Sequence, residues 1–271
     1  MRCVVVLLAV FGLGCLPDDL REPPAEVLVT IEPSLATREG FYTTTGWYVG
    51  FEQVALNIGR VGFPDDENCT YYSFTQYSWL IDMTEARREK VGIAHALGDC
   101  RLRFDAPAVD PDVVRLGVGA NETMVDLMDY ELSIAVLGYA SRGEEVIPFG
   151  MGTTYLSFGP CLDGFGSTSL ATSNLASGQA YDVPLLFDAE ALLSTLSSPG
   201  SSDLDFSTAD SDDNGLVDGY EIFQALVASG DATLEAEVAG YQLSTVGNAL
   251  RLRDGGPCLL VDPADQGFSP F

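Results

Sequence analysis

YELSIAVLGYA, residues 130–140, is followed after a short polar turn by VIPFGMGTTYLSF, residues 146–158. Both stretches are rich in β-branched and aromatic residues, which favour extended strands. The turn, residues 141–144, contains Gly143, and glycine adopts tight turn conformations at little steric cost. The pattern predicts a β-hairpin, so a β-rich domain is the starting interpretation for the rest of the chain.

Similar short strands are predicted on both sides of this hairpin. Apolar residues alternate in WYVGF (47–51) and again in VALNI (54–58), as expected for strands with one buried face. Further strand-like runs are VLVTI (27–31), YYSF (71–74), WLIDM (79–83), VGIAHAL (91–97), RLRF (101–104) and YDVPLLF (181–187). Because Gly, Pro and Asp separate these runs, we predict an antiparallel β-sandwich over residues 27–187.

The pattern changes after this region. AEALLSTL (189–196) and YQLSTVGNALRLR (241–253) have the apolar spacing of helices. The predicted fold is therefore mainly β, with the sandwich followed by a small helical C-terminal segment over residues 188–271. No internal repeat of useful length is present.

An acidic loop lies inside the C-terminal segment. Residues 210–221 read DSDDNGLVDGYE, in which oxygen-bearing side chains recur at fixed spacing. Hard cations such as Ca²⁺ take about six to eight oxygen ligands from carboxylates, amides and backbone carbonyls. The composition of the loop therefore indicates a cation site.

The loop resembles the calcium loop of the EF-hand family at all its fixed positions. Gly215 stands where that loop turns sharply, and Val217 is the apolar residue expected to point into the core. The resemblance implies Ca²⁺ held by side-chain oxygens, one backbone carbonyl, one carboxylate that binds directly or through water, and a final bidentate glutamate. These ligands are Asp210, Asp212, Asn214, Leu216 (the carbonyl), Asp218 and Glu221.

The flanking sequence favours a single structural loop over a regulatory pair. After the loop, a helix is predicted because Ile222, Phe223, Leu226 and Val227 share one face. Before it, SPGSSDLDFSTA (198–209) contains Pro and Gly and does not predict a full helix. No second loop of the pattern exists in the chain. The competing interpretation is a chance match in a chain with 40 acidic residues.

The N-terminus indicates export. Met1 and Arg2 are followed by an apolar run over residues 4–14 that is too short to span a bilayer. With Cys15 after a small residue, the segment resembles a bacterial lipoprotein leader, although Gly12 stands where Leu is usual. The resemblance implies a signal peptide over 1–14, lipid on Cys15, a tether over 15–26 and an outer-membrane location. The alternative is a plain secretory signal cleaved a few residues later.

The remaining cysteines fit an oxidising compartment. Cys69, Cys100, Cys161 and Cys258 form an even set without CxxC spacing, which favours two disulfides. Three connectivities are open, and we predict Cys69 with Cys100 and Cys161 with Cys258, since the second bond would fasten the acidic-loop region to the main domain. Zinc binding is disfavoured because the cysteines are scattered and the chain has one histidine.

The charge excludes one class of partner. The formal net charge is −27, and basic side chains are few compared with acidic ones. Because phosphate contacts need basic side chains, nucleic-acid binding is not expected. It also disfavours adhesion to anionic lipid headgroups. Solubility outside the cell is the simplest reason for the charge.

No catalytic motif stands out. GxSxG and HExxH are absent from the sequence, and His95, the one histidine, is interpreted as structural. We therefore expect a calcium-binding exported lipoprotein that is not an enzyme, with a glycan or a protein as ligand. The alternatives are a calcium-stabilised secreted hydrolase that uses paired carboxylates and a dockerin-like element. A deep polar pocket would favour the hydrolase, and a flat aromatic face would favour the binding module.

Overall fold

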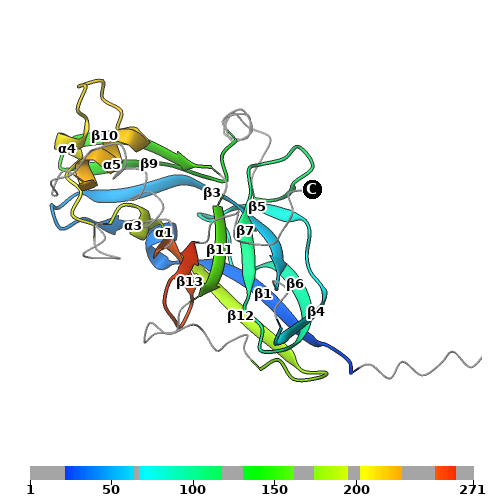
Figure 1. The fold of residues 1–271 in the computed structure, drawn as a ribbon. Coiled ribbons are helices and arrows are strands. Elements are labelled where there is room, and N and C mark those ends of the chain that lie inside the picture. Colours follow the sequence, from blue (N-terminus) through cyan, green and yellow to red (C-terminus); the bar gives the residue numbers. More distant parts are fainter. Residues whose placement is uncertain are drawn as a thin grey trace, which may run out of the picture.

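The computed structural model describes residues 22–63, 67–117, 131–154, 156–161, 174–194, 202–227 and 248–260. Within these ranges the chain is mainly β-strand, in two sheets with a few short helices (Figure 1). The predicted fold class is therefore confirmed. The predicted signal peptide, Cys15 and most of the tether lie outside the described residues.

One sheet has five strands in the order β13-β12-β1-β6-β4. Its central strand β1 pairs antiparallel with β6 but parallel with β12, so the sandwich is not purely antiparallel. The strands are β1 (Ala25–Pro33), β4 (Cys69–Ser73), β6 (Glu89–Gly98), β12 (Ala180–Phe187) and β13 (Leu250–Leu252).

The other sheet has nine strands, with the path β10-β9-β3-β7-β11-β14 and with β2, β5 and β8 beside it. The strands are β2 (Phe41–Tyr42), β3 (Tyr48–Gly62), β5 (Ser78–Asp82), β7 (Arg103–Ala106), β8 (Val114–Leu116), β9 (Ile134–Arg142), β10 (Glu145–Thr153), β11 (Leu156–Cys161) and β14 (Cys258–Leu260). Most buried apolar side chains of both sheets form one core, and Ala55, Leu80, Val109 and Ala135 form a small second cluster.

The long strand β3 joins the two predicted strands WYVGF and VALNI. Its register with β9 shifts between Phe51 and Gln53, which marks a β-bulge. The extra residue explains why the apolar positions Val49 and Phe51 are followed by Val54 and not by residue 53. The bulge therefore keeps one face of β3 in the core from Val49 to Ile58.

The predicted hairpin is confirmed in β9 and β10, which pair from Ile134–Thr153 to Arg142–Glu145. The turn is shorter than predicted because residues 141 and 142 belong to β9. The predicted second strand divides, since β10 ends at Thr153 and β11 begins at Leu156, and β11 pairs with β7 and β14 instead of β9. Figure 1 shows β3, β9 and β10 extending together, with α4 and α5 against this extension.

The helices are short: α1 (Leu35–Glu39), α3 (Ala189–Leu192), α4 (Phe206–Ala209) and α5 (Gly219–Val227). Helix over residues 241–253 is a wrong prediction for Leu250–Leu252, which form β13. Leu250 and Leu252 are buried and Arg251 is half-buried, and all three pair with β12. Pairing with a strand distant in sequence overrides the local helical pattern. Residues 241–247 lie outside the described residues.

Both predicted disulfides are present, Cys69–Cys100 and Cys161–Cys258. The second joins β11 to β14, where the two cysteines are direct cross-strand partners. It closes a loop of 97 residues that contains α4 and α5. The bond therefore fixes β14, which follows the acidic-loop region in the chain, to β11.

Candidate metal centre

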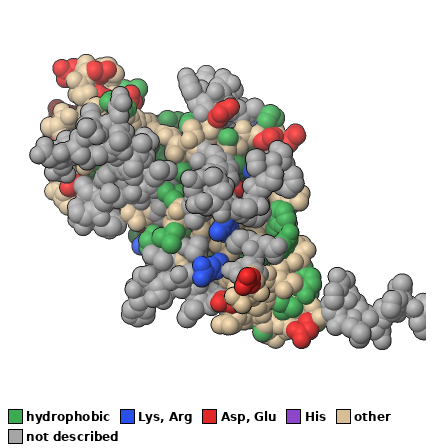
Figure 2. Space-filling model, viewed as in Figure 1, with side chains coloured by type: hydrophobic (Ala, Val, Ile, Leu, Met, Phe, Trp, Pro, Cys, Tyr) green, Lys and Arg blue, Asp and Glu red, His purple; other side chains and the backbone are tan. Residues whose placement is uncertain are grey.

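The acidic loop, residues 210–221, connects α4 to α5. Acidic side chains gather at the tip of the molecule where this loop lies (Figure 2). The expectation that no full helix precedes the loop is confirmed, since α4 has four residues. The helix predicted after the loop is confirmed as the nine-residue α5, although α5 begins inside the loop at Gly219.

Three carboxylates come together where the acidic loop begins and ends. One oxygen from each of Asp210, Asp212 and Glu221 lies within 4.8 Å of the others. Carboxylates this close repel one another when ionised, and a divalent cation between them relieves the repulsion. The donor set fits a hard cation such as Ca²⁺, which prefers oxygen ligands.

Backbone N–H groups of the loop hold the first two carboxylates. Asp210 accepts the Asn214 N–H at 3.1 Å on Oδ1 and the Gly215 N–H at 2.9 Å on Oδ2. Asp212 Oδ1 accepts the same Asn214 N–H at 3.1 Å. The turn that allows these bonds needs positive φ at Asp213 (56°) and Gly215 (80°), angles that Asp and Gly tolerate.

Glu221 is the buried member of the cluster, with 6% of its surface exposed. Its Oε1 accepts the Ser211 N–H at 2.8 Å and the Ser211 hydroxyl at 2.9 Å, and its Oε2 accepts the Asp218 N–H at 3.1 Å. Burial raises the pKa of Glu221, but these hydrogen bonds more than offset burial, so the pKa lies below its ordinary value. Both oxygens are held in the ionised form that a bidentate ligand requires.

The other three implied ligands have different surroundings. The Asn214 amide donates to Asp212 Oδ2 at 2.9 Å, and its Oδ1 accepts the Leu216 N–H at 2.7 Å. Asp218 Oδ1 accepts the Glu221 N–H at 2.9 Å, so this side chain caps α5. Because Asp218 is not part of the carboxylate cluster, contact with an ion through water suits it better than direct contact.

The acidic loop is attached to the edge strand β10. Val217, which is fully buried, forms a parallel bridge with Phe149. The Val217 N–H donates to the Pro148 carbonyl at 3.0 Å, and the Gly150 N–H donates to the Val217 carbonyl at 3.1 Å. The predicted inward direction of Val217 is confirmed. An edge strand of the sandwich, and not a second loop, supports the acidic loop within the described residues.

Aromatic contacts connect α4 to the same sheet. The Phe206 ring lies 5.8 Å from that of Trp47 and 5.4 Å from that of Phe149, between centroids. The buried Trp47 indole donates from Nε1 to Asp205 Oδ1 at 2.9 Å, and this carboxylate also caps α4. The Arg142 guanidinium lies 4.3 Å from the centroid of the Trp47 ring. Both ends of the acidic loop are thus positioned by the sandwich.

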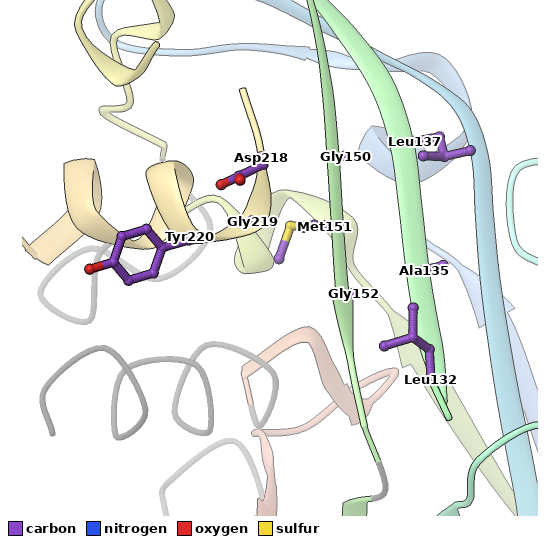
Figure 3. A pocket seen from close by; sticks show the side chains of 9 residues that line it. All are labelled: Leu132, Ala135, Leu137, Gly150, Met151, Gly152, Asp218, Gly219 and Tyr220. Atoms are coloured by element: carbon purple, nitrogen blue, oxygen red, sulfur yellow. The ribbon is translucent and has the colours of Figure 1, made fainter. Parts of the chain in front are cut away.

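A pocket of about 320 Å³ lies beside the acidic loop. Figure 3 shows Gly150 and Gly152 of β10 between leucines on one side and the start of α5 on the other. Of the nine lining residues, Asp218 alone is charged. The lining residues are Leu132, Ala135, Leu137, Gly150, Met151, Gly152, Asp218, Gly219 and Tyr220. The pocket does not assemble the paired carboxylates that the hydrolase alternative needs.

His95 lies opposite Ser73 of β4 and Glu26 of β1 on neighbouring strands. Its Nδ1 is 2.8 Å from the Ser73 hydroxyl, and its Nε2 is 3.7 Å from the Glu26 carboxylate. These are the residue types of a serine hydrolase triad. They stand on an open strand surface, however, and do not line the pocket beside the acidic loop. A second pocket, which lies around Asp82, does not include them either. We interpret them as cross-strand surface pairs.

No family model, curated protein or solved structure matches the chain. The chain's own residues and the EF-hand resemblance of the acidic loop therefore define the candidate site. Among the described residues, no helix has the length and apolar character needed to cross a membrane.

Sequence analysis missed two features of this centre. Ser211 holds Glu221 through two hydrogen bonds, but the calcium-loop pattern leaves its position unrestricted. The support from β10 was also missed. The alternation of β10 marks it as a strand, but nothing local in the sequence places it at an edge beside Val217.

Proposed function

We propose that the protein is an exported lipoprotein that binds one Ca²⁺ ion in the acidic loop and acts as a non-catalytic binding or structural module of the cell envelope. The observation that carries this proposal is the close group of carboxylates from Asp210, Asp212 and Glu221. The leader sequence and the two disulfides support export. Cys15 would attach the domain to the outer membrane through lipid.

Calcium has a structural role in this proposal. Without a cation, the ionised carboxylates repel one another, and the loop ends that they belong to are attached to α4, α5 and β10. Binding would therefore order the loop and stabilise this end of the nine-stranded sheet. Because one loop binds alone and follows a four-residue helix, we expect a dissociation constant on the order of 10⁻⁵ to 10⁻³ M, typical of extracellular modules.

Thermal and chemical unfolding with calcium and with a chelator test the proposal. A ligand that binds only the folded state stabilises it by about 2.7 kcal/mol at a hundredfold excess over the dissociation constant. We expect a rise in melting temperature with millimolar calcium that a chelator reverses. An unchanged melting temperature at every calcium concentration would refute the calcium proposal.

Lipid attachment has its own test. Metabolic labelling with a fatty-acid analogue should mark the wild-type protein, and Cys15→Ser should abolish the label while the protein is still exported. A soluble and unlabelled wild-type protein would exclude the lipid anchor and leave the plain secretory signal.

A further inference from the structure

One face of the extension formed by β2, β3, β9 and β10 carries an unusual set of side chains. Strand register places them together: Tyr42 is opposite Tyr48, Tyr139 is opposite Pro148, and Val146 is opposite Ser141, the cross-strand partner of Tyr48. Directly paired residues share a face, as do residues two apart. We call this surface the tyrosine face; it consists of Tyr42, Tyr48, Leu137, Tyr139, Val146 and Pro148.

The tyrosine face is exposed, in contrast to the opposite face of the same strands. Tyr42 is 73% exposed, Val146 61% and Leu137 39%. On the opposite face, Val49 is fully buried and Phe149 is 2% exposed. Apolar side chains gathered on an exposed surface mark interaction sites more often than scattered ones do.

Two of the tyrosine rings lie directly over glycines. A Cβ on Gly50 would lie 2.7 Å from Cζ of Tyr139, and one on Gly40 would lie 2.6 Å from the hydroxyl of Tyr48. The rings of Tyr139 and Tyr48 therefore pack directly on glycine backbone, in space that a side chain at either glycine would occupy. The three rings form a row, with centroids 5.3 Å apart for Tyr42 and Tyr48 and 6.3 Å apart for Tyr48 and Tyr139.

Charge indicates what this face would bind. The faces of aromatic rings attract cations, and the chain has a net charge of −27. Next to the row, the Tyr48 hydroxyl donates to the Glu39 carbonyl at 2.7 Å. Burial, followed by the neighbours Tyr139, Tyr42 and Glu39, raises the pKa of Tyr48, and of these neighbours Glu39 is the one that places a carboxylate beside the row. A second copy of this chain, an anionic lipid surface or a nucleic acid would be repelled.

We propose that the tyrosine face docks a partner protein through an extended segment in which lysine or arginine side chains alternate with apolar ones. The cationic groups lie over the tyrosine rings, and the apolar side chains contact Leu137, Val146 and Pro148. The inference names the partner class for the binding module of the proposed function and rests on it, but docking uses no ligand of the acidic loop.

The test is calorimetric titration of the calcium-saturated full domain with a synthetic octapeptide of alternating valine and lysine. The test variant is Tyr42→Ser with Tyr139→Ser. The matched control is Tyr71→Ser with Tyr77→Ser, which removes two tyrosines that are 43% and 53% exposed elsewhere on the molecule. We expect the test variant to bind at least about tenfold more weakly, a loss of about 1.4 kcal/mol, and the control to bind as the wild type does.

Two further variants guard against a folding artefact. Tyr42→Ser alone alters the most exposed ring and should weaken binding, whereas Tyr42→Phe keeps the ring and should not. Equal affinity for the test variant and the wild type would overturn the inference, since binding would then reflect net charge alone. Binding of a neutral gluco-oligosaccharide in place of the peptide would overturn the inference in favour of a glycan ligand. Binding of a second octapeptide, with glutamate in place of each lysine, would also contradict it.

Calcium titration of the same preparation separates this inference from the proposed function. Peptide binding without calcium binding would overturn the calcium proposal alone. Calcium binding without peptide binding would overturn the docking inference alone.

Discussion

Val217 of the acidic loop and Phe149 of β10 are partners in a parallel β-bridge, although they lie far apart in the sequence. Through this bridge the loop extends the nine-stranded sheet beyond its edge strand. A free sheet edge leaves unpaired N–H and C=O groups, so the bridge both covers part of β10 and fixes the loop backbone. A change that disturbs the conformation of the acidic loop should therefore also lower the stability of the sheet edge at β10.

Val217→Ala tests this coupling. Shortening a fully buried side chain leaves a small cavity and should lower the free energy of unfolding by about 2 kcal/mol. Calcium affinity should fall as well, because the loop loses its support. Denaturant unfolding and calcium titration measure the two effects. Leu216→Ala is the control: its side chain is 46% exposed and its implied ligand is the backbone carbonyl, which the substitution keeps, so both quantities should remain close to wild type. Equal effects at the two positions would show that the bridge has no special role.

Asp205 supports the other end of the loop. Asp205→Ala removes the cap of α4 and leaves the buried Trp47 indole without its acceptor. Loss of a cap and of a buried hydrogen bond together should cost about 3 kcal/mol in unfolding free energy. The indole fluorescence should change because the group beside it is gone. Asp203→Ala, at an exposed position two residues earlier, should leave stability unchanged. A small effect of Asp205→Ala would mean that the indole is not anchored by this residue.

The same carboxylate should make stability depend on pH. Burial raises the pKa of Asp205, but hydrogen bonds from Ser207 and Trp47 and the charge of Arg142 outweigh burial, so the pKa lies below its ordinary value. The stabilising effect is then complete above the unfolded-state pKa of about 3.9 and is lost as the pH falls through the lower folded-state pKa.

Asp205→Asn isolates this effect. The difference in unfolding free energy between wild type and variant should be constant from about pH 7 to about pH 5 and should shrink below about pH 4. Urea unfolding at a series of pH values measures it. A difference that grows on acidification would have the wrong sign for a lowered pKa.

The Cys161–Cys258 disulfide should be the more stabilising of the two. In the chain-entropy account, closing a loop of 97 residues is worth about 4.7 kcal/mol, against about 3.7 kcal/mol for the 31 residues between Cys69 and Cys100. Paired Cys→Ser variants at each bond, followed by denaturant unfolding, compare the two values. Thiol titration of the unfolded mature protein should find none of the four cysteines reduced. Reactive thiols at these positions would contradict the pairing.

Sequence patterns predicted the features that depend on residues close together in the chain. The apolar alternation in residues 47–51 and 54–58 predicted two strands, and the structure joins them in β3 through a bulge that was not predicted. The spacing of the acidic loop brought Asp210, Asp212 and Glu221 into one set, and the structure brings these carboxylates together. Residue type and spacing within one strand or loop involve only a few neighbouring positions, so both can be read from the sequence.

Pairings between distant segments were not predictable in this way. The parallel pairing of β1 with β12 joins residues about 150 positions apart, and β13 adopts the extended form because β12 offers it an edge. The cross-strand contacts of His95 and the tyrosine face likewise depend on register between strands. No local composition specifies such contacts, because burial and available partners decide them.

Calcium titration by calorimetry tests the proposed site in the acidic loop, with wild type, Glu221→Gln and Asp213→Asn compared at equal protein concentration. Glu221→Gln removes the buried bidentate carboxylate. Asp213→Asn removes the same charge from the same loop, but this residue is outside the carboxylate cluster, and asparagine also tolerates its positive φ. The account predicts one site in the wild type, little change in Asp213→Asn, and affinity at least about tenfold weaker in Glu221→Gln, a loss of about 1.4 kcal/mol. No binding heat in the wild type at millimolar calcium, or equal losses in the two variants, would contradict a specific calcium site in the acidic loop.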